Sequence, residues 1–211
     1  MPSQALIMVD IQNDFMPGGN LAVPDGHTIV PVVNRLSQHA PLCVATQDWH
    51  PTDHLSFASQ HAGKVPFETI DLNGIEQTLW PDHCCQNTSG AEFHPNLAMG
   101  PVQAIFRKGM DRYVDSYSGF YDNQHAHSTG LAGYLKTLGV NHVFITGLCA
   151  DICVYYTLKD ALSAGFECCL IEDATKALDL TAYQTIKTNL IQQGVEFINA
   201  ATALDRFNQH Q

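Results

Sequence analysis

Six short runs of apolar, β-prone residues recur along the chain, and within them the apolar residues are nearly continuous rather than alternating with polar ones. They cover residues 5–10, 42–46, 102–107, 142–147, 167–173 and 195–200. Strands with one face in water alternate between apolar and polar residues, whereas strands covered on both faces do not. The runs therefore predict a buried, mostly parallel sheet.

Amphipathic helical patterns lie between several of these runs. They cover residues 28–39, 129–139, 151–165 and 181–194. Gly139, Gly165 and Gly194 stand where helices commonly end, and Thr181 is the expected N-cap of the last helix. Strands that alternate with helices predict a three-layer α/β/α domain around a six-stranded, mostly parallel sheet.

The bulk composition limits the class of protein. A length of 211 residues suits one domain over residues 1–211, and 45% apolar with 15% charged residues argues against disorder. The net charge of −11 repels phosphate backbones and anionic lipid, so neither nucleic acid nor a membrane surface is expected as a partner. The last residues, 208–211, are expected to be frayed.

The first residues and the cysteines predict the cellular compartment of the protein. The opening sequence MPSQALIMVD has no basic segment or cleavage site of a signal peptide, and no apolar run approaches the ~18 residues that span a bilayer. The seven cysteines include no Cys-x-x-Cys pair and do not resemble a disulfide framework. We therefore expect a cytoplasmic protein with reduced thiols.

Residues 47–100 break the strand–helix rhythm. This stretch holds five of the eleven histidines, and its large aromatic residues argue against disorder. Long loops inside a compact domain are usually functional. We expect this region to carry metal-binding and substrate-binding residues.

Chemically active side chains follow the ends of four successive predicted strands. They are Asp10 after the first, Asp48 and His50 after the second, Arg107 and Lys108 at the end of the third, and Cys153 in the first turn of the helix after the fourth. Ligands of open parallel sheets bind at the carboxyl ends of the strands. The coincidence predicts an active site at that edge.

A thiol with a pKa near ~8.5 is only a few percent ionised at neutral pH. The helix N-terminus and the ammonium of Lys108 favour the thiolate, so we expect a lowered pKa for Cys153 and, by desolvation, a raised one for Asp10, the proton acceptor. Each residue also has an ordinary interpretation: a small buried Cys, an Asp that caps a turn, and a solvated Lys.

The sequence Asp48-Trp-His50 places two metal-ligand groups on the same side of an extended chain. Carboxylate and imidazole suit Zn²⁺, Fe²⁺ or Mn²⁺, and three protein ligands would leave positions open for water or substrate. The candidates for a third ligand are His54 and His83, followed by His61 and His94. A polar turn rich in Asp and His is the alternative interpretation.

Six motifs occur in order along the chain: ALIMVDIQNDF, TQDWHP, WPDHC, AEFHP, RKGMD followed by DSYSGF, and TGLCADICV. From about residue 5 to residue 200, the chain closely resembles the bacterial nicotinamidases (pyrazinamidases) of the isochorismatase-like hydrolase superfamily. WPDHC together with Asp-x-His resembles the metal-bearing nicotinamidase branch and differs from metal-free relatives such as isochorismatases and ureido-hydrolases.

The resemblance implies a hydrolase that converts nicotinamide to nicotinate and ammonia through a cysteine thioester, in NAD salvage, and that also accepts pyrazinamide. It implies that Asp10, Lys108 and Cys153 form a catalytic triad. It further implies that the backbone N–H groups of Cys149 and Cys153 form an oxyanion hole, with a cis peptide bond before Cys149.

The resemblance also implies one divalent metal ion, zinc or iron, with manganese as a third candidate. The implied ligands are Asp48, His50 and His83, with His54 as an additional candidate. The metal would bind the pyridine nitrogen, and Phe15 and Trp80 would line a slot for the flat ring. A homo-oligomer is expected of this fold.

Two positions depart from the commoner family pattern. The motif GLCAD replaces GIATD, which places the thiol of Cys149 close to Cys153, and Ile152 replaces a side chain that is polar in some members. Two other functions stay open: an amidohydrolase for ureido acids or other small amides, and a non-catalytic metal-binding scaffold. A ureido-hydrolase would use the triad without the metal.

Overall fold

The computed structural model describes residues 3–72 and 74–209. Its main sheet has six strands in the order β5-β2-β1-β6-β7-β8, and all neighbours are parallel. The strands are β1 (Gln4–Val9), β2 (Cys43–Asp48), β5 (Ala104–Lys108), β6 (His142–Leu148), β7 (Glu167–Lys176) and β8 (Glu196–Ile198). Each predicted apolar run supplies one strand, so the predicted α/β fold is confirmed.

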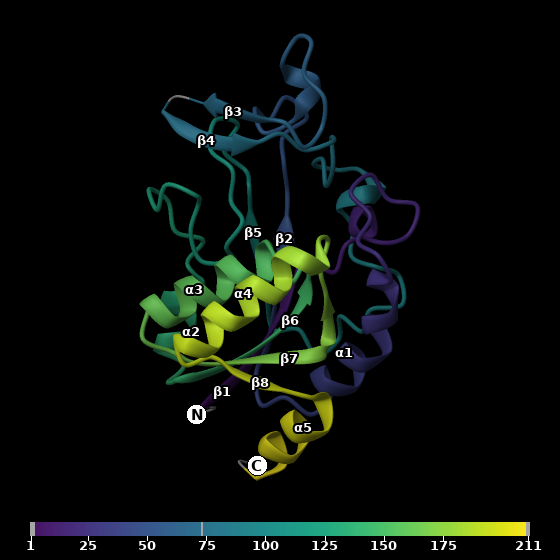
Figure 1. Cartoon of the computed structure of the whole chain (residues 1–211). Helices are drawn as coiled ribbons and strands as arrows, with labels where there is room; N and C mark the ends of the chain where they lie inside the picture. Colours follow the sequence, from purple (N-terminus) through teal and green to yellow (C-terminus); the bar gives the residue numbers. More distant parts are fainter. Residues whose placement is uncertain (1–2, 73, 210–211) are drawn as a thin grey trace.

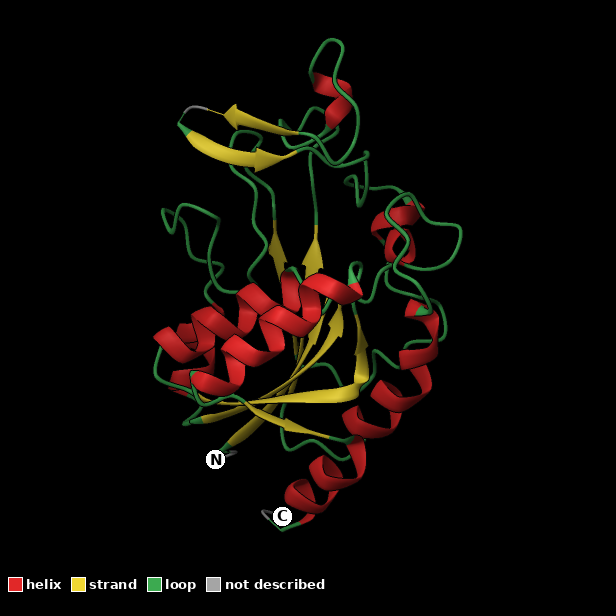
Figure 2. Cartoon of the chain, in the orientation of Figure 1, coloured by secondary structure: helices red, strands yellow, loops and turns green. Residues whose placement is uncertain are grey.

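Helices cover both faces of the sheet (Figures 1 and 2). They are α1 (Val30–Ser37), α2 (Leu131–Thr137), α3 (Cys153–Ser163), α4 (Leu180–Gln192) and α5 (Ala200–Asn208). Leu6 and Met8 pack in the core with α1 and α5, whereas Ile7 and Val9 pack in the core with α2, α3 and α4. Successive side chains of a strand point to opposite faces, so β1 is buried throughout.

Two details at the C-terminal end differ from the prediction. The N-cap of α4 is Asp179, whose carboxylate accepts hydrogen bonds from the N–H groups of Thr181 and Ala182, so the expected cap at Thr181 was wrong. The chain also forms α5, capped by Asn199, over residues between the last predicted strand and the expected tail, for which the sequence predicted no element. Residues 210 and 211 of the expected frayed tail lie outside the described residues.

The long stretch 47–100 contains an antiparallel hairpin of β3 (Thr69–Leu72) and β4 (Ile75–Thr78). In Figure 1 this hairpin lies beyond the carboxyl ends of β2 and β5. Its side chains are mostly exposed or half-buried, so it has no apolar run that would have revealed it.

The strand order places a crevice at one point of the sheet. From β1 the chain goes to β2 and β5 on one side, and it later goes to β6, β7 and β8 on the other. The connections diverge at the carboxyl ends of β1 and β6, which is where open α/β sheets bind ligands. Among the described residues, no helix has the length and apolar character needed to cross a membrane.

Candidate active site

Lys108 is the centre of a buried cluster at this crevice. The register of β2 against β5 pairs Lys108 with Asp48, and the lysine Nζ lies 2.7 Å from Asp48 Oδ1. The same Nζ lies 2.9 Å from Asp10 Oδ2 and 3.6 Å from the Sγ of Cys153. It also donates a 2.8 Å hydrogen bond to the carbonyl of Ser116. The structure thus brings the three predicted triad residues together around one ammonium group.

Asp10 is held in place by a neighbouring strand. It follows β1 with a left-handed backbone (φ 48°), and its Oδ1 accepts a 2.6 Å hydrogen bond from the Thr46 hydroxyl. Thr46 lies two residues before Asp48 on β2, so both side chains point to the same face. Sequence reasoning missed Thr46, although this spacing of two was the signal that could have identified it.

The charges of the cluster follow from its burial and its composition. Burial raises the pKa of Asp10 above its ordinary value, and the ammonium of Lys108 offsets this only in part. Burial acts in the same direction on Asp48, but Lys108 and His50 outweigh it and hold that pKa well below its ordinary value. Burial opposes the charge of Lys108, yet Asp10 and Asp48 keep its pKa well above the ordinary value. Lys108 is therefore a stable ammonium.

Cys153 is the first residue of α3 and is buried. Burial raises the pKa of its thiol well above the ordinary value, and Lys108 opposes this without cancelling it. Our prediction of a lowered pKa was wrong in sign, because desolvation outweighs one ammonium at 3.6 Å. The resting thiol keeps its proton, so any attack by the sulfur requires a base beside it.

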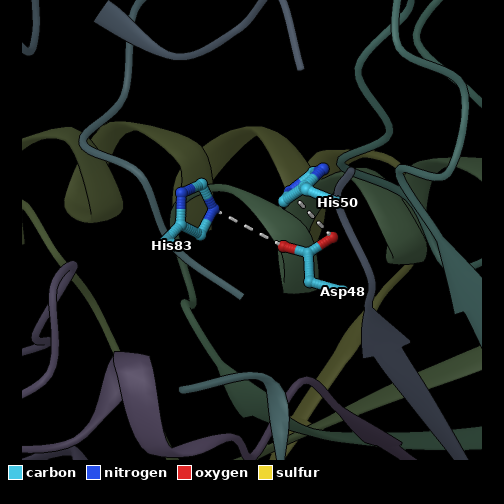
Figure 3. Close-up of side chains that lie close together, drawn as sticks. All are labelled: Asp48, His50 and His83. Atoms are coloured by element: carbon cyan, nitrogen blue, oxygen red, sulfur yellow. Dashed lines mark ion pairs between the residues drawn. The ribbon is translucent and has the colours of Figure 1, made fainter. Parts of the chain in front are cut away.

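Asp48, His50 and His83 form a second cluster (Figure 3). Asp48 Oδ1 lies 3.5 Å from His50 Nε2, and Asp48 Oδ2 lies 3.8 Å from His83 Nε2. One potential ligand atom of each residue lies within 4.8 Å of the others, and all three residues are buried. These are the three residues that the family resemblance implies as metal ligands, whereas spacing alone left the third ligand open between His54 and His83.

The hydrogen bonds behind the two rings fit metal binding. The Nδ1–H of His50 donates to the Gly109 carbonyl at 2.9 Å, and that of His83 donates to the Pro81 carbonyl at 2.8 Å. Because a carbonyl can only accept, each Nδ1 carries a hydrogen, and in the neutral ring Nε2 is the nitrogen that presents a lone pair to the cluster. One carboxylate and two such imidazoles suit zinc, iron or manganese.

His54 lies beside this cluster but has a different hydrogen-bond pattern. Its ring centroid is 4.6 Å from that of His50, and a second group of possible ligands combines both rings with Asp115. However, His54 Nδ1 accepts a hydrogen bond from the Ser56 N–H, which places the hydrogen of the neutral ring on Nε2. Burial lowers the pKa of His54 to about 4, so the ring is neutral. In this tautomer His54 Nε2 offers no lone pair, whereas a ring whose Nδ1 donates to the Ser56 hydroxyl at 2.7 Å would present one.

The two weaker histidine candidates lie apart from these groups. His61 Nε2 donates a 2.8 Å hydrogen bond to the Leu55 carbonyl, and His94 Nδ1 accepts a hydrogen bond from the Asn96 N–H. Within residues 3–72 and 74–209, neither joins a group that could hold a metal ion.

The arrangement predicts a difference between two histidine variants. His83→Ala removes a lone pair that faces Asp48, so we expect the affinity of the protein for zinc to fall by about 10-fold or more. His54→Ala removes a ring that offers none, so zinc content should stay near one ion per chain. Metal analysis of both purified variants against the wild type checks this. If His83→Ala kept its full zinc content and His54→Ala lost zinc, His54 rather than His83 would be the metal ligand.

Gly109 is required for the position of His50. Its φ is +66°, and a Cβ on Gly109 would lie 2.3 Å from the Cε1 of the His50 ring. We expect Gly109→Ala to displace His50 and to weaken zinc binding by about 10-fold or more. Zinc titration of the metal-free variant tests this. Gly133→Ala is the control, because a Cβ there meets no atom within 4 Å; equal zinc affinity in both variants would contradict the argument.

A pocket joins the two clusters. It is narrow, with about 20 Å³ of room for a water-sized molecule, and its lining residues are Phe15, Leu21, Asp48, Trp80, His83, Asp115, Tyr117, Cys149, Ile152 and Cys153. Phe15 and Trp80, which the family resemblance implies as residues of the slot for a flat ring, lie on its wall. Tyr117 was missed; its hydroxyl accepts a hydrogen bond from Trp80 Nε1 at 3.3 Å, which fixes the indole edge. The aromatic lining suits a flat, apolar ring.

The peptide bond between Leu148 and Cys149 is cis, as expected. Both Cys149 and Cys153 line the pocket. Burial raises the pKa of the Cys149 thiol, and a hydrogen bond from the backbone N–H of Cys153 acts in the opposite direction, so this N–H lies beside the Cys149 sulfur. Arg107 is placed elsewhere: its guanidinium stacks 3.8 Å from the centre of the Trp49 ring.

The fold and the two clusters define a class of α/β hydrolase with a buried cysteine at the switch point of an open parallel sheet. The chain belongs to the isochorismatase family, because residues 4–202 match the isochorismatase domain. It is 47% identical over 201 residues to the nicotinamidase of Acinetobacter baylyi, which covers 95% of this chain and 94% of that protein. It is 44% identical over 184 residues to the nicotinamidase of Escherichia coli, and the match covers 85% of this chain and 86% of that protein.

Solved structures agree with this relationship. The Acinetobacter baumanii nicotinamidase/pyrazinamidase matches with a TM-score of 0.93 at 47% identity, covering 96% of this chain and 98% of that one. The yeast nicotinamidase bound to the inhibitor nicotinaldehyde matches with a TM-score of 0.86 at 29% identity, covering 93% and 99%. The pyrazinamidase of Pyrococcus horikoshii in complex with zinc matches with a TM-score of 0.77 at 37% identity, covering 94% and 99%.

Proposed function

We propose that this chain is a nicotinamidase that hydrolyses nicotinamide to nicotinate and ammonia in NAD salvage, and that it also accepts pyrazinamide. The main support is the convergence of a thiol, an ammonium and a carboxylate with an Asp–His–His cluster in one aromatic-lined pocket. The near full-length identity to nicotinamidases supports the same reaction.

The first half of the reaction forms the thioester. The Sγ of Cys153 attacks the amide carbonyl carbon while its proton passes to Asp10, whose raised pKa makes it a better base. The backbone N–H groups of Cys149 and Cys153 hold the resulting oxyanion, each contributing about 3 kcal/mol to the transition state. Asp10 then gives the proton to the leaving nitrogen, ammonia departs, and the acyl group stays on sulfur.

The second half regenerates the enzyme. Asp10 removes a proton from a water molecule, and the oxygen attacks the thioester carbonyl at the same oxyanion site. The carbon–sulfur bond breaks, the proton returns to the Cys153 sulfur, and nicotinate leaves. Lys108 keeps its charge throughout, and it fixes Asp10 and Asp48 with respect to the thiol.

Asp48, His50 and His83 are the residues that would hold a zinc, iron or manganese ion. Such an ion supplies a Lewis-acidic centre that binds a pyridine nitrogen and orients the ring. The zinc complex of the Pyrococcus horikoshii relative supports zinc as a candidate. Phe15 and Trp80 would flank the ring. All seven cysteines are free, which supports the reducing cytoplasm as the site of action.

The test is an ammonia assay on the zinc-loaded protein with three substrates. We expect release from nicotinamide and pyrazinamide, and no release from a ureido acid. Turnover of the ureido acid alone would assign the chain to the ureido-hydrolase branch. No turnover of any substrate, with zinc bound, would indicate a scaffold that has lost catalysis.

A further inference from the structure

The side chain of Gln12 makes the hydrogen bonds that a neighbouring strand would make at the end of β2. Strand β1 pairs with β2 only as far as Met8 and Ala45, but β2 continues to Asp48. The Gln12 amide accepts a hydrogen bond from the Asp48 N–H at 2.8 Å, and its Nε2 donates to the Asp48 carbonyl at 2.8 Å. Gln12 thus makes the two backbone hydrogen bonds of a strand neighbour, and it is fully buried.

The side chain of Asp14 holds the turn that carries His83. Its Oδ2 accepts a 2.7 Å hydrogen bond from the N–H of Cys84, a residue with a left-handed backbone (φ 46°) that directly follows His83. Its Oδ1 accepts a hydrogen bond from the Asn20 N–H. Gly90 provides the space for this carboxylate, because a Cβ there would lie 2.1 Å from Asp14 Oδ2.

We propose that Gln12 and Asp14 are positioning residues that set the metal affinity of the Asp48–His50–His83 cluster. Gln12 fixes the backbone of one ligand, and Asp14 fixes the turn beside another. Both hydrogen bonds are buried, so their loss leaves backbone groups unpaired and lets the ligand move. The inference rests on the proposed metal site and adds residues that contact neither the ion nor the thiol.

The expected size of the effect follows from other metal sites. Loss of a side chain that orients a ligand typically weakens metal affinity by about 10- to 100-fold. Because the three ligands themselves remain, a high metal concentration should refill the site. We therefore expect weaker zinc binding in both variants and recovery of kcat at saturating zinc, a pattern that a general loss of structure would not give.

The experiment measures the zinc affinity of metal-free protein by competition with a chromophoric chelator. The variants are Gln12→Ala and Asp14→Ala, and the matched control is Asn13→Ala. Asn13 lies between them and donates to the Ser89 carbonyl at 2.8 Å, but it contacts no ligand residue. We expect about 10- to 100-fold weaker binding in the two variants and at most about a twofold change in the control.

Three results would overturn the inference: wild-type affinity in both variants, an equal loss in Asn13→Ala, or a kcat that stays low at saturating zinc. If either alanine variant fails to fold, as judged by circular dichroism, Gln12→Glu and Asp14→Asn replace them, since each keeps the size of the side chain and removes one of its hydrogen-bonding groups, the Nε2 donor of Gln12 or one acceptor oxygen of Asp14. Absence of zinc binding by the wild type is a separate result; it removes the proposed metal site, and this inference with it.

Discussion

Cys153→Ala should abolish ammonia release from nicotinamide and leave bound zinc unchanged. The proposed reaction forms its thioester on this sulfur, which lies 3.6 Å from the ammonium that orders the cluster. Removal of the nucleophile from a comparable catalytic unit costs about 10⁴-fold or more in kcat. The assay is steady-state ammonia release, paired with metal analysis of the same sample.

The control for this variant is Cys85→Ala. Cys85 is half-buried and belongs to the loop after His83, but it is not part of the pocket that contains Cys153. We expect it to retain activity within about threefold of the wild type, as surface-near substitutions usually do. If Cys153→Ala turned over nicotinamide within tenfold of the wild type, the nucleophile would have to be sought elsewhere.

Lys108→Met should destabilise the metal-free protein by about 3–5 kcal/mol, the usual cost of leaving buried charges without a partner. The lysine Nζ lies within 2.9 Å of both Asp10 and Asp48, and all three side chains are buried. Loss of the ammonium removes the group that lowers the pKa of both carboxyls. The free energy of unfolding from urea titration at neutral pH measures the deficit, and activity should be lost as well.

The pH dependence of this deficit has a definite sign. Without Lys108, the folded-state pKa of both carboxyls moves upward, and that of Asp10, which burial already raises above its ordinary value, moves further up. A carboxyl whose pKa is higher in the folded than in the unfolded protein lowers the free energy of unfolding at pH values above its folded-state pKa. This loss of stability disappears as the pH falls and the carboxyl is protonated in the folded protein. The deficit should therefore shrink at acid pH. The loss of stability should also be smaller in the double variant Asp10→Asn/Lys108→Met, which has one buried carboxylate fewer. A loss below about 1 kcal/mol at neutral pH in Lys108→Met alone would contradict the argument that Lys108 holds the cluster together.

The parts of the fold that the sequence predicted are those with a continuous apolar signal. Six buried strands each require a run of apolar residues, and their alternation with helices predicts a parallel sheet with its site at the carboxyl ends of the strands. The β3–β4 hairpin is mostly exposed, and α5 is a short helix directly after a strand, so neither had a comparable signal. The hairpin and α5 had to come from the structure.

The candidate site divides in the same way. Asp10, Lys108 and Cys153 have reactive side chains at strand ends, so their chemistry is visible in the sequence. Thr46 and Gln12 act through hydrogen bonds to residues 36 positions away, which no local pattern reveals. The sign of the Cys153 pKa shift depends on the balance between burial and Lys108, and only the three-dimensional arrangement decides it.

The central claim is that Cys153 attacks the carbonyl carbon of a pyridine carboxamide inside the pocket shared with the Asp48–His50–His83 cluster. A crystal structure of the zinc-loaded chain with nicotinaldehyde tests it most directly, because an aldehyde carbon accepts a thiol as the amide does but has no nitrogen to expel. We predict a covalent bond between that carbon and the Cys153 sulfur, with the oxygen within hydrogen-bond distance of the Cys149 and Cys153 N–H groups. An aldehyde bound outside this pocket, or bonded to another cysteine, would contradict the claim.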